Sequence, residues 1–295
     1  MIAQAATSRR LLSDYVALTK PRILSLLLFI ALCGMFLAAK GIPDARLVVL
    51  VLTGGALAAG GAHALNHYFE RDIDALMRRT RRRPVASGRV SPREALVFGV
   101  LLNVIAFILL GALVNTLSAV LTLGATLFYL FVYTLALKRR TPQNIVIGGA
   151  AGAVPPMVGW AAVTGGLDAP ALYMFAIVFF WTPPHFWALA LLIKDDYTLA
   201  GIPMLPVVRT VRETKRSILR YTFVLVALTL VFATSDAVGV VYTAAASLLG
   251  VIFIYSSWRL SRRPGISGAK SAYLYSLLYL ALLFMAMAAD VFVTL

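Results

Sequence analysis

Nine long apolar runs divide the chain at nearly regular intervals, and short polar connections separate them. The runs cover residues 24–39, 47–69, 95–114, 117–137, 145–164, 170–193, 218–233, 238–258 and 272–292. Each is near the ~20 residues that an α-helix needs to cross the hydrocarbon core of a bilayer. The pattern therefore predicts an all-α fold, a polytopic bundle of about nine transmembrane helices. No linker separates domains, so we expect residues 1–295 to form one domain.

The composition agrees with a membrane protein. Of the 295 residues, 61% are hydrophobic, 13% are charged, and the mean hydropathy is +0.87. A soluble globule of this size does not need so much apolar surface to cover its core. Glycine and alanine crowd residues 54–64 and 148–153, which predicts seams where helices pack closely in lipid.

A net charge of +15 would suit a nucleic-acid partner, but the placement of the charges favours a membrane topology. Of the 27 Lys and Arg, all but Lys40 and Arg46 lie on alternate connections. An excess of Lys and Arg marks the cytoplasmic loops of membrane proteins. We therefore expect a cytoplasmic N-terminus in the cell (inner) membrane, with the basic loops on the same side, and no nucleic-acid partner.

The second apolar run ends in three oxygen-bearing side chains, Asn66, Glu70 and Asp74, spaced four residues apart. At 100° per residue, each step drifts only about 40°, so one helix face would carry all three. Acids at the end of a membrane helix are costly and by default suggest a function. A mixed-charge stop signal is the alternative, but such a signal does not require this spacing.

A second acidic cluster, Asp195 and Asp196, follows the sixth run between Lys194 and Tyr197. Runs two and six are both even-numbered, so the topology places both clusters at the same membrane face. Two sets of carboxylates without Cys or His-rich spacing suit a shared Mg²⁺ ion. The arginines that follow Asp74 would then suit an anionic phosphate.

These motifs resemble those of the UbiA superfamily of intramembrane prenyltransferases. In that superfamily, an Asn-x-x-x-Asp/Glu-x-x-x-Asp motif on the second helix binds Mg²⁺ and an isoprenoid diphosphate, and Asn66, Glu70 and Asp74 match it. The resemblance implies a nine-helix bundle with its active site at the cytoplasmic helix ends. The catalytic set it implies is Asn66, Glu70, Asp74, Asp195 and Asp196, of which Asn66, Glu70, Asp74 and Asp196 are the metal ligands.

The second motif departs from the common Asp-x-x-x-Asp pattern. Aligned on Gly201, those two positions are Ile193 and Tyr197, and Asp195 and Asp196 lie between them. Either aspartate of the pair can therefore be the metal ligand.

Three further motifs resemble the branch of the superfamily that farnesylates heme. They are Met77-x-Arg79-Thr80-x-x-Arg83-Pro84, Pro184-His185-Phe186-Trp187, and Asp195-Asp196-Tyr197-x-x-Ala200-Gly201-Ile202-Pro203-Met204-Leu205-Pro206. That branch joins the farnesyl group of farnesyl diphosphate to a vinyl group of protoheme IX (heme B). The products are diphosphate and heme O, with its hydroxyethylfarnesyl side chain. The resemblance also suggests a heme-delivery protein or heme A synthase as a partner.

The residues that the resemblance implies as substrate contacts are Arg79, Arg83, Lys138, Lys194, His67, His185 and Tyr197. Arg79 and Arg83 belong to the heme-type motif, whereas Arg81 and Arg82 do not. His67 and His185 are candidates for heme propionate or iron, and packing is the alternative for both.

Two other functions remain open. One is a prenyltransferase of the same superfamily that acts on an aromatic quinone precursor, although the heme-type motifs argue against it. The other is a transporter. Transporters usually place charged groups near the midplane of the membrane, often within inverted repeats, whereas these acids lie at helix ends.

Overall fold

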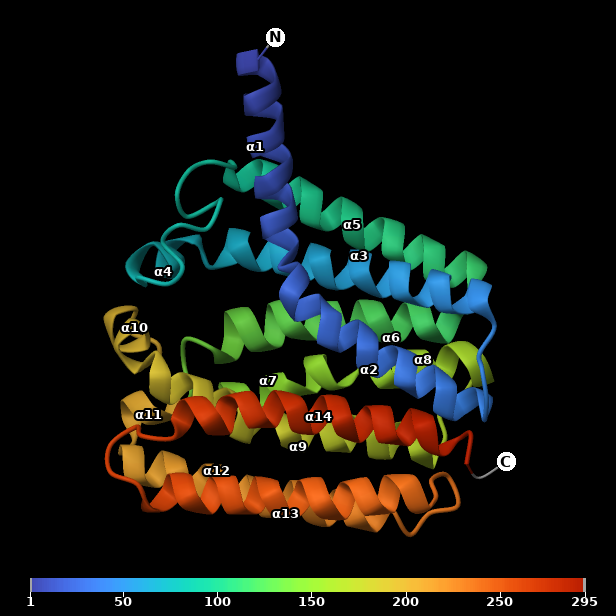
Figure 1. Ribbon diagram of the computed structural model, residues 1–295. Helices are drawn as coiled ribbons and strands as arrows, with labels where there is room; N and C mark the ends of the chain where they lie inside the picture. The colour runs from blue at the N-terminus through green and yellow to red at the C-terminus, as the bar shows by residue number, and fades with distance from the viewer. Residues whose placement is uncertain (1, 294–295) are drawn as a thin grey trace.

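The computed structural model describes residues 2–293, and within that range it contains helices and no β-strand. The helices run side by side in one bundle (Figure 1). Their bounds are α1 Ile2–Thr19, α2 Pro21–Ala39, α3 Ala45–Phe69, α4 Arg71–Leu76, α5 Pro92–Leu113, α6 Thr116–Leu127, η1 Phe128–Leu137, α7 Asn144–Ala153, α8 Pro155–Thr164, α9 Ala169–Leu192, α10 Lys194–Leu199, α11 Leu205–Val208, α12 Val211–Phe232, α13 Val240–Arg262 and α14 Ala269–Asp290.

All nine apolar runs are helical, and eight segments within the described residues are long and apolar enough to cross a membrane. These are α2, α3, α5, α6 with η1, α7 with α8, α9, α13 and α14. The remaining run is α12, whose first turns carry Arg212, Lys215 and Arg216 and shorten its apolar part. It packs between α9 and α13. The chain is a multi-pass membrane protein.

Close helix contacts occur where the small residues cluster, as the sequence predicted. A Cβ atom added to Gly61 of α3 would lie 2.7 Å from the carbonyl oxygen of Gly99 in α5, and one on Gly99 would lie 2.9 Å from that of Gly61. A Cβ atom on Gly148 of α7 would overlap the ring of Tyr133 in η1. Any larger side chain at these glycines would therefore push the helices apart.

The short helices α4, α10 and α11 gather at one end of the bundle (Figure 1). They belong to the connections that follow α3 and α9, so both acidic clusters lie at the same end, as the even-numbered runs predicted. The segment that returns from α4 to α5, residues 77–91, also lies there. These connections form the end of the molecule that carries the candidate site.

Helix α1 was not expected, because charges interrupt the N-terminal segment and no long apolar run marks it. It extends away from the bundle in Figure 1, and the C-terminal end of α1 contacts α3. The packing of Leu18, which is fully buried against Ala64, fixes that end of α1. Lys20 joins α1 to α2 and so lies beside the end of α3.

Candidate functional site

The helix that carries Asn66, Glu70 and Asp74 bends at Glu70, which ends α3 and precedes α4. Its backbone angles there are φ −102° and ψ 8°. The four-residue register nevertheless continues, since the Glu70 N–H donates to the Asn66 carbonyl at 2.9 Å and the Asp74 N–H donates to the Glu70 carbonyl at 2.8 Å. The single straight helix expected from the sequence is therefore wrong, but the three side chains still lie on neighbouring turns. All three are buried, with 1–2% of their surface exposed.

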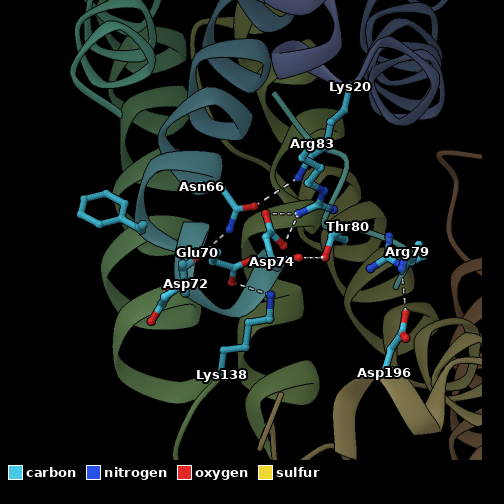
Figure 2. A network of polar contacts seen from close by, with 12 residues as sticks. Lys20, Asn66, Glu70, Asp72, Asp74, Arg79, Thr80, Arg83, Lys138 and Asp196 are labelled. Atoms are coloured by element: carbon cyan, nitrogen blue, oxygen red, sulfur yellow. Dashed lines mark hydrogen bonds and ion pairs between the residues drawn. The ribbon is translucent and has the colours of Figure 1, made fainter. Parts of the chain in front are cut away.

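Each buried carboxylate in this group has a basic partner (Figure 2). Lys138 forms an ion pair with Glu70, and Nη1 of Arg83 donates to both carboxylate oxygens of Asp74 at 2.8 Å. An isolated charge in such a place would cost several kcal/mol, and the two cations offset that cost. Thr80 also donates its hydroxyl to the Asp74 carbonyl at 2.9 Å, which folds the return segment over the site.

Asn66 connects two further parts of the chain to the group. Its Oδ1 accepts a hydrogen bond from Nζ of Lys20 at 3.1 Å, and its Nδ2 donates to the hydroxyl of Thr134 at 3.4 Å. Lys20 has a left-handed backbone, φ 51° and ψ 59°, which is uncommon outside glycine. Such outliers persist where the surrounding structure holds them, often at functional sites. No sequence motif predicted a site role for Lys20.

Thr134 lies in a π-helix that the sequence gave no reason to expect, and Lys138 directly follows that helix. η1 continues α6 with wider turns, and its last bond runs from the Lys138 N–H to the Tyr133 carbonyl at 2.9 Å. Segments of π-helix are rare and occur frequently at functional sites. The wider turn brings Thr134 to Asn66 and Lys138 to Glu70.

The two aspartates of the second cluster face different surroundings. Asp196 in α10 is 9% exposed, and its carboxylate accepts hydrogen bonds from the backbone N–H groups of Arg78 and Arg79, both at 3.1 Å. Asp195 is exposed and Lys194 is half-buried. Of the pair, Asp196 is therefore the one directed at the return segment, where it holds the loop that carries the arginines.

The charges of the site shift several pKa values. Burial favours the neutral form of Glu70, but the attraction of Lys138 outweighs it and leaves the pKa of Glu70 below its usual 4.5. Burial, followed by repulsion from Arg83, lowers the pKa of Lys20 to about 7. Burial also raises the pKa of Tyr197 to about 12, so its phenol keeps its proton at neutral pH.

A basic cleft of about 520 Å³ opens beside Asn66, between the junction of α1 and α2 and the return segment. Its lining includes the basic side chains Lys20, Arg22, Arg79, Arg82, Arg83 and Arg89, together with His67. Neither ring nitrogen of His67 has a hydrogen-bond partner among the described residues. Within the described part of the chain, the lining carries these six basic side chains and no acidic one, which suits an anion with several oxygens.

The sequence motifs predict only part of this basic cleft. Arg79 and Arg83 were selected from their motif, whereas Lys20, Arg22 and Arg89 were not, and Arg82 was assigned no role. Nothing in the local pattern distinguishes these residues from the other arginines of the loops. Arg81, by contrast, is exposed and does not line the cleft.

The residues that could bind a metal ion are present, but their side chains do not surround a common point. In residues 2–293, no group of three or more His, Cys, Asp or Glu lies close enough to bind a metal. Asn66, Glu70 and Asp74 nevertheless offer the hard oxygen donors that Mg²⁺ prefers. The donor chemistry therefore fits Mg²⁺, and at present Lys138 and Arg83 balance the charge of the two carboxylates.

His185 lies on α9 and packs against α14. Its Nδ1 lies 2.8 Å from the hydroxyl oxygen of Ser276. The ring stacks on Trp181 with centroids 4.2 Å apart and on Tyr273 at 5.0 Å. It is therefore part of a separate aromatic cluster and not of the acidic group.

Comparison with known proteins places this arrangement in a family. The UbiA prenyltransferase family matches residues 27–287. A protein from Saccharopolyspora erythraea named protoheme IX farnesyltransferase 1 is 51% identical over 285 residues, which cover 96% of this chain and 91% of that protein. A Roseiflexus protein named protoheme IX farnesyltransferase is 49% identical over 280 residues, or 95% of this chain. This chain spans about half the length of that relative, 52%.

Solved structures share the fold. A UbiA homologue from Archaeoglobus fulgidus, whose structure holds DMAPP and Mg²⁺, aligns with a TM-score of 0.68 at 18% identity, covering 96% of this chain and 100% of the other. The arrangement of helices seen here is therefore that of the UbiA fold.

Proposed function

The chain belongs to the UbiA prenyltransferase family, and from that premise we propose that it transfers the farnesyl group of farnesyl diphosphate to a vinyl group of heme B, giving heme O. The observation that carries the proposal is the buried pair of carboxylates, Glu70 and Asp74, beside a cleft of six basic side chains. This combination suits a diphosphate that leaves as a highly charged anion. We choose heme B as the acceptor because relatives about 50% identical to this chain are named protoheme IX farnesyltransferase.

The basic cleft binds the diphosphate. Arg79 and Arg83 donate planar, bidentate hydrogen bonds to phosphate oxygens, which a lysine ammonium cannot reproduce. Lys20 sits between Asn66 and the cleft and adds a further positive charge. Cations fixed around the leaving oxygens stabilise the charge that develops there as the bond breaks, which is commonly the largest contribution to the rate.

Four residues would hold Mg²⁺: Asn66, Glu70, Asp74 and Asp196. The first three lie on neighbouring turns and are buried. Asp196 comes from α10 and contacts the return segment at Arg78. When bound, the ion neutralises diphosphate oxygens as a Lewis acid. Asp196 also fixes the backbone of Arg78 and Arg79, so it orients the arginines of the cleft.

The transfer is a substitution at C1 of the farnesyl group, followed by addition of water to the former vinyl group. The bond between C1 of farnesyl and the diphosphate oxygen breaks, and the electron pair leaves with the diphosphate. The π electrons of the vinyl group form the new carbon–carbon bond to C1. Water then adds to the cationic carbon next to the porphyrin and loses a proton. The products are heme O, diphosphate and one proton.

The orientation follows from the charges. Lys and Arg on alternate connections favour a cytoplasmic location for the end of the bundle that carries the site, in the cell membrane. Lys138 and Arg139 lie at that end, beside Glu70 and Asp72. A water-soluble diphosphate would then be released into the cytoplasm. A heme-delivery protein or heme A synthase would be the partner that supplies heme or accepts the product.

The test is incubation of membranes containing the chain with labelled farnesyl diphosphate and heme B, followed by chromatography of the products. Label in a heme that is more apolar than heme B supports the proposal. Label in an aromatic acid, offered in place of heme, would assign the chain to quinone-precursor prenylation. Accumulation of unchanged substrate inside sealed vesicles would indicate transport.

A further inference from the structure

We propose that His185 ligates the heme iron through Nε2, and that Ser276 holds the imidazole in the tautomer that leaves Nε2 free. This inference rests on the proposed function, since it assumes that heme is a substrate. It goes further by choosing one iron ligand among the three histidines and by naming a positioning residue on α14.

The hydrogen bonds around Ser276 fix the tautomer. Its hydroxyl donates to the backbone carbonyl of Tyr273 at 2.6 Å, so the hydroxyl proton is already used. The contact of 2.8 Å between the same oxygen and Nδ1 of His185 must then have Nδ1–H as the donor. In a neutral imidazole with Nδ1 protonated, Nε2 carries the lone pair. That nitrogen is the one available to a metal.

The ring is also held in place by its neighbours. Trp181 stacks on it with an angle of 17° between the planes, and Tyr273 stacks on it at 29°. The indole N–H of Trp181 donates to the Ser276 carbonyl at 2.7 Å, which ties α9 to α14 at the same residue. Restrained orientation is what a metal-ligating imidazole requires.

The other two histidines lack this arrangement. A histidine that ligates a metal almost always donates its second ring N–H to a partner. Both ring nitrogens of His63 and His67 are buried and have no partner among the described residues. His185 has a partner for Nδ1, and its Nε2 is not among the enclosed, unpartnered atoms of the described residues. His185 itself is only partly buried, so an approach to Nε2 remains.

An axial bond from His185 would give the heme a fixed attachment point between α9 and α14.

The test is spectroscopy of the purified full chain loaded with hemin. The wild type should show an imidazole-ligated Soret band and electron paramagnetic resonance signal. His185→Ala should lose that signature, and added imidazole should restore it, because the truncated side chain leaves room for the free ligand. His63→Ala is the matched control and should keep the wild-type spectrum.

Ser276 is tested as a positioning residue by resonance Raman of the ferrous protein. Ser276→Ala should lower the iron–imidazole stretching frequency and weaken hemin binding by about 10-fold or more, as loss of such partners does in other metal sites. Ser276→Thr keeps the hydroxyl and should keep the frequency. Retained binding of farnesyl diphosphate in each variant shows that the fold is intact.

Two outcomes would overturn this inference while leaving the proposed function in place. One is a wild type that makes heme O while the His185→Ala spectrum is unchanged. The other is a change in the spectrum on His67→Ala but not on His185→Ala. A wild type that neither binds hemin nor makes heme O would instead refute the proposed function.

Discussion

The ion pair between Lys138 and Glu70 offers a sharp test of how the site holds its charges. Both side chains are buried, at 8% and 2% exposure, and they join the end of η1 to the end of α3. Lys138→Met keeps the unbranched side chain to within one atom of its length but removes its charge. Breaking one partner of a buried pair usually costs about 3–5 kcal/mol, because the other charge stays buried. We expect about 3 kcal/mol, since Lys20 and Arg83 still attract Glu70.

The cost should depend on pH in a defined direction. In the wild type, Glu70 has a lowered pKa, so its contribution to stability is present above the usual 4.5 and is lost as the pH falls through the folded value. Without Lys138, burial raises the pKa of Glu70, and the charged form then costs free energy above 4.5. The difference between wild type and Lys138→Met should therefore be largest at neutral pH and shrink as the pH falls toward 4.5.

The assay is reversible unfolding in mixed detergent micelles, followed by circular dichroism. The matched control is Arg139→Met, since Arg139 pairs with Asp72 across the same loop, with the two side chains 36% and 59% exposed. An exposed pair contributes about 0–1 kcal/mol, so this variant should lose little. The double variant with Glu70→Gln should recover part of the loss. Equal losses for the Lys138 and Arg139 variants, independent of pH, would refute the reasoning.

Three further predictions concern turnover. Glu70→Gln should abolish heme O formation while the protein stays folded, because the amide keeps the shape but loses the charge that binds metal; product at the wild-type rate would contradict this. Arg79→Lys and Arg83→Lys should raise the KM for farnesyl diphosphate or lower kcat. Arg81 is exposed and does not line the cleft, so Arg81→Lys should do neither. Equal effects in steady-state kinetics at all three positions would mean that these arginines only set the membrane topology. Because the pKa of Lys20 is about 7, kcat/KM should fall as the pH rises through 7, and Lys20→Arg should shift that fall upward; identical pH profiles would count against a role for the Lys20 charge.

Much of the fold could be predicted from the apolar pattern, because lipid imposes a length on each spanning helix. All nine runs are helices, and the close contact of Gly61 with Gly99 agrees with the predicted seam. The pattern could not predict the π-helix η1, since its residues are as apolar as those of α6. It also could not predict α1, whose C-terminal end is fixed by packing onto α3.

The site was predictable where a spacing carried the information. Asn66, Glu70 and Asp74 were selected from their four-residue interval, and all three are buried together. The partners of these groups were harder to predict. Lys20 lies 46 residues from Asn66 in the chain, and its role follows only from the left-handed turn between α1 and α2. Long-range pairs of this kind leave no periodic signal in a single sequence.

The preference for Asp196 over Asp195 has a similar origin. Both aspartates occupy the first turn of α10, and nothing in the sequence separates them. In the structure, Asp196 is buried and accepts hydrogen bonds from the backbone N–H groups of Arg78 and Arg79, whereas Asp195 is exposed. The metal role of either residue stays a prediction.

The most direct measurement of the central claim is mass spectrometry of heme recovered after the purified chain is incubated with heme B and farnesyl diphosphate in ¹⁸O-labelled water. The account predicts a heme heavier by one farnesyl group and one hydroxyl group, with the heavy oxygen in that hydroxyl, and none from Asp74→Asn. Recovery of heme B alone from the wild type, or a farnesylated heme without solvent oxygen, would contradict it.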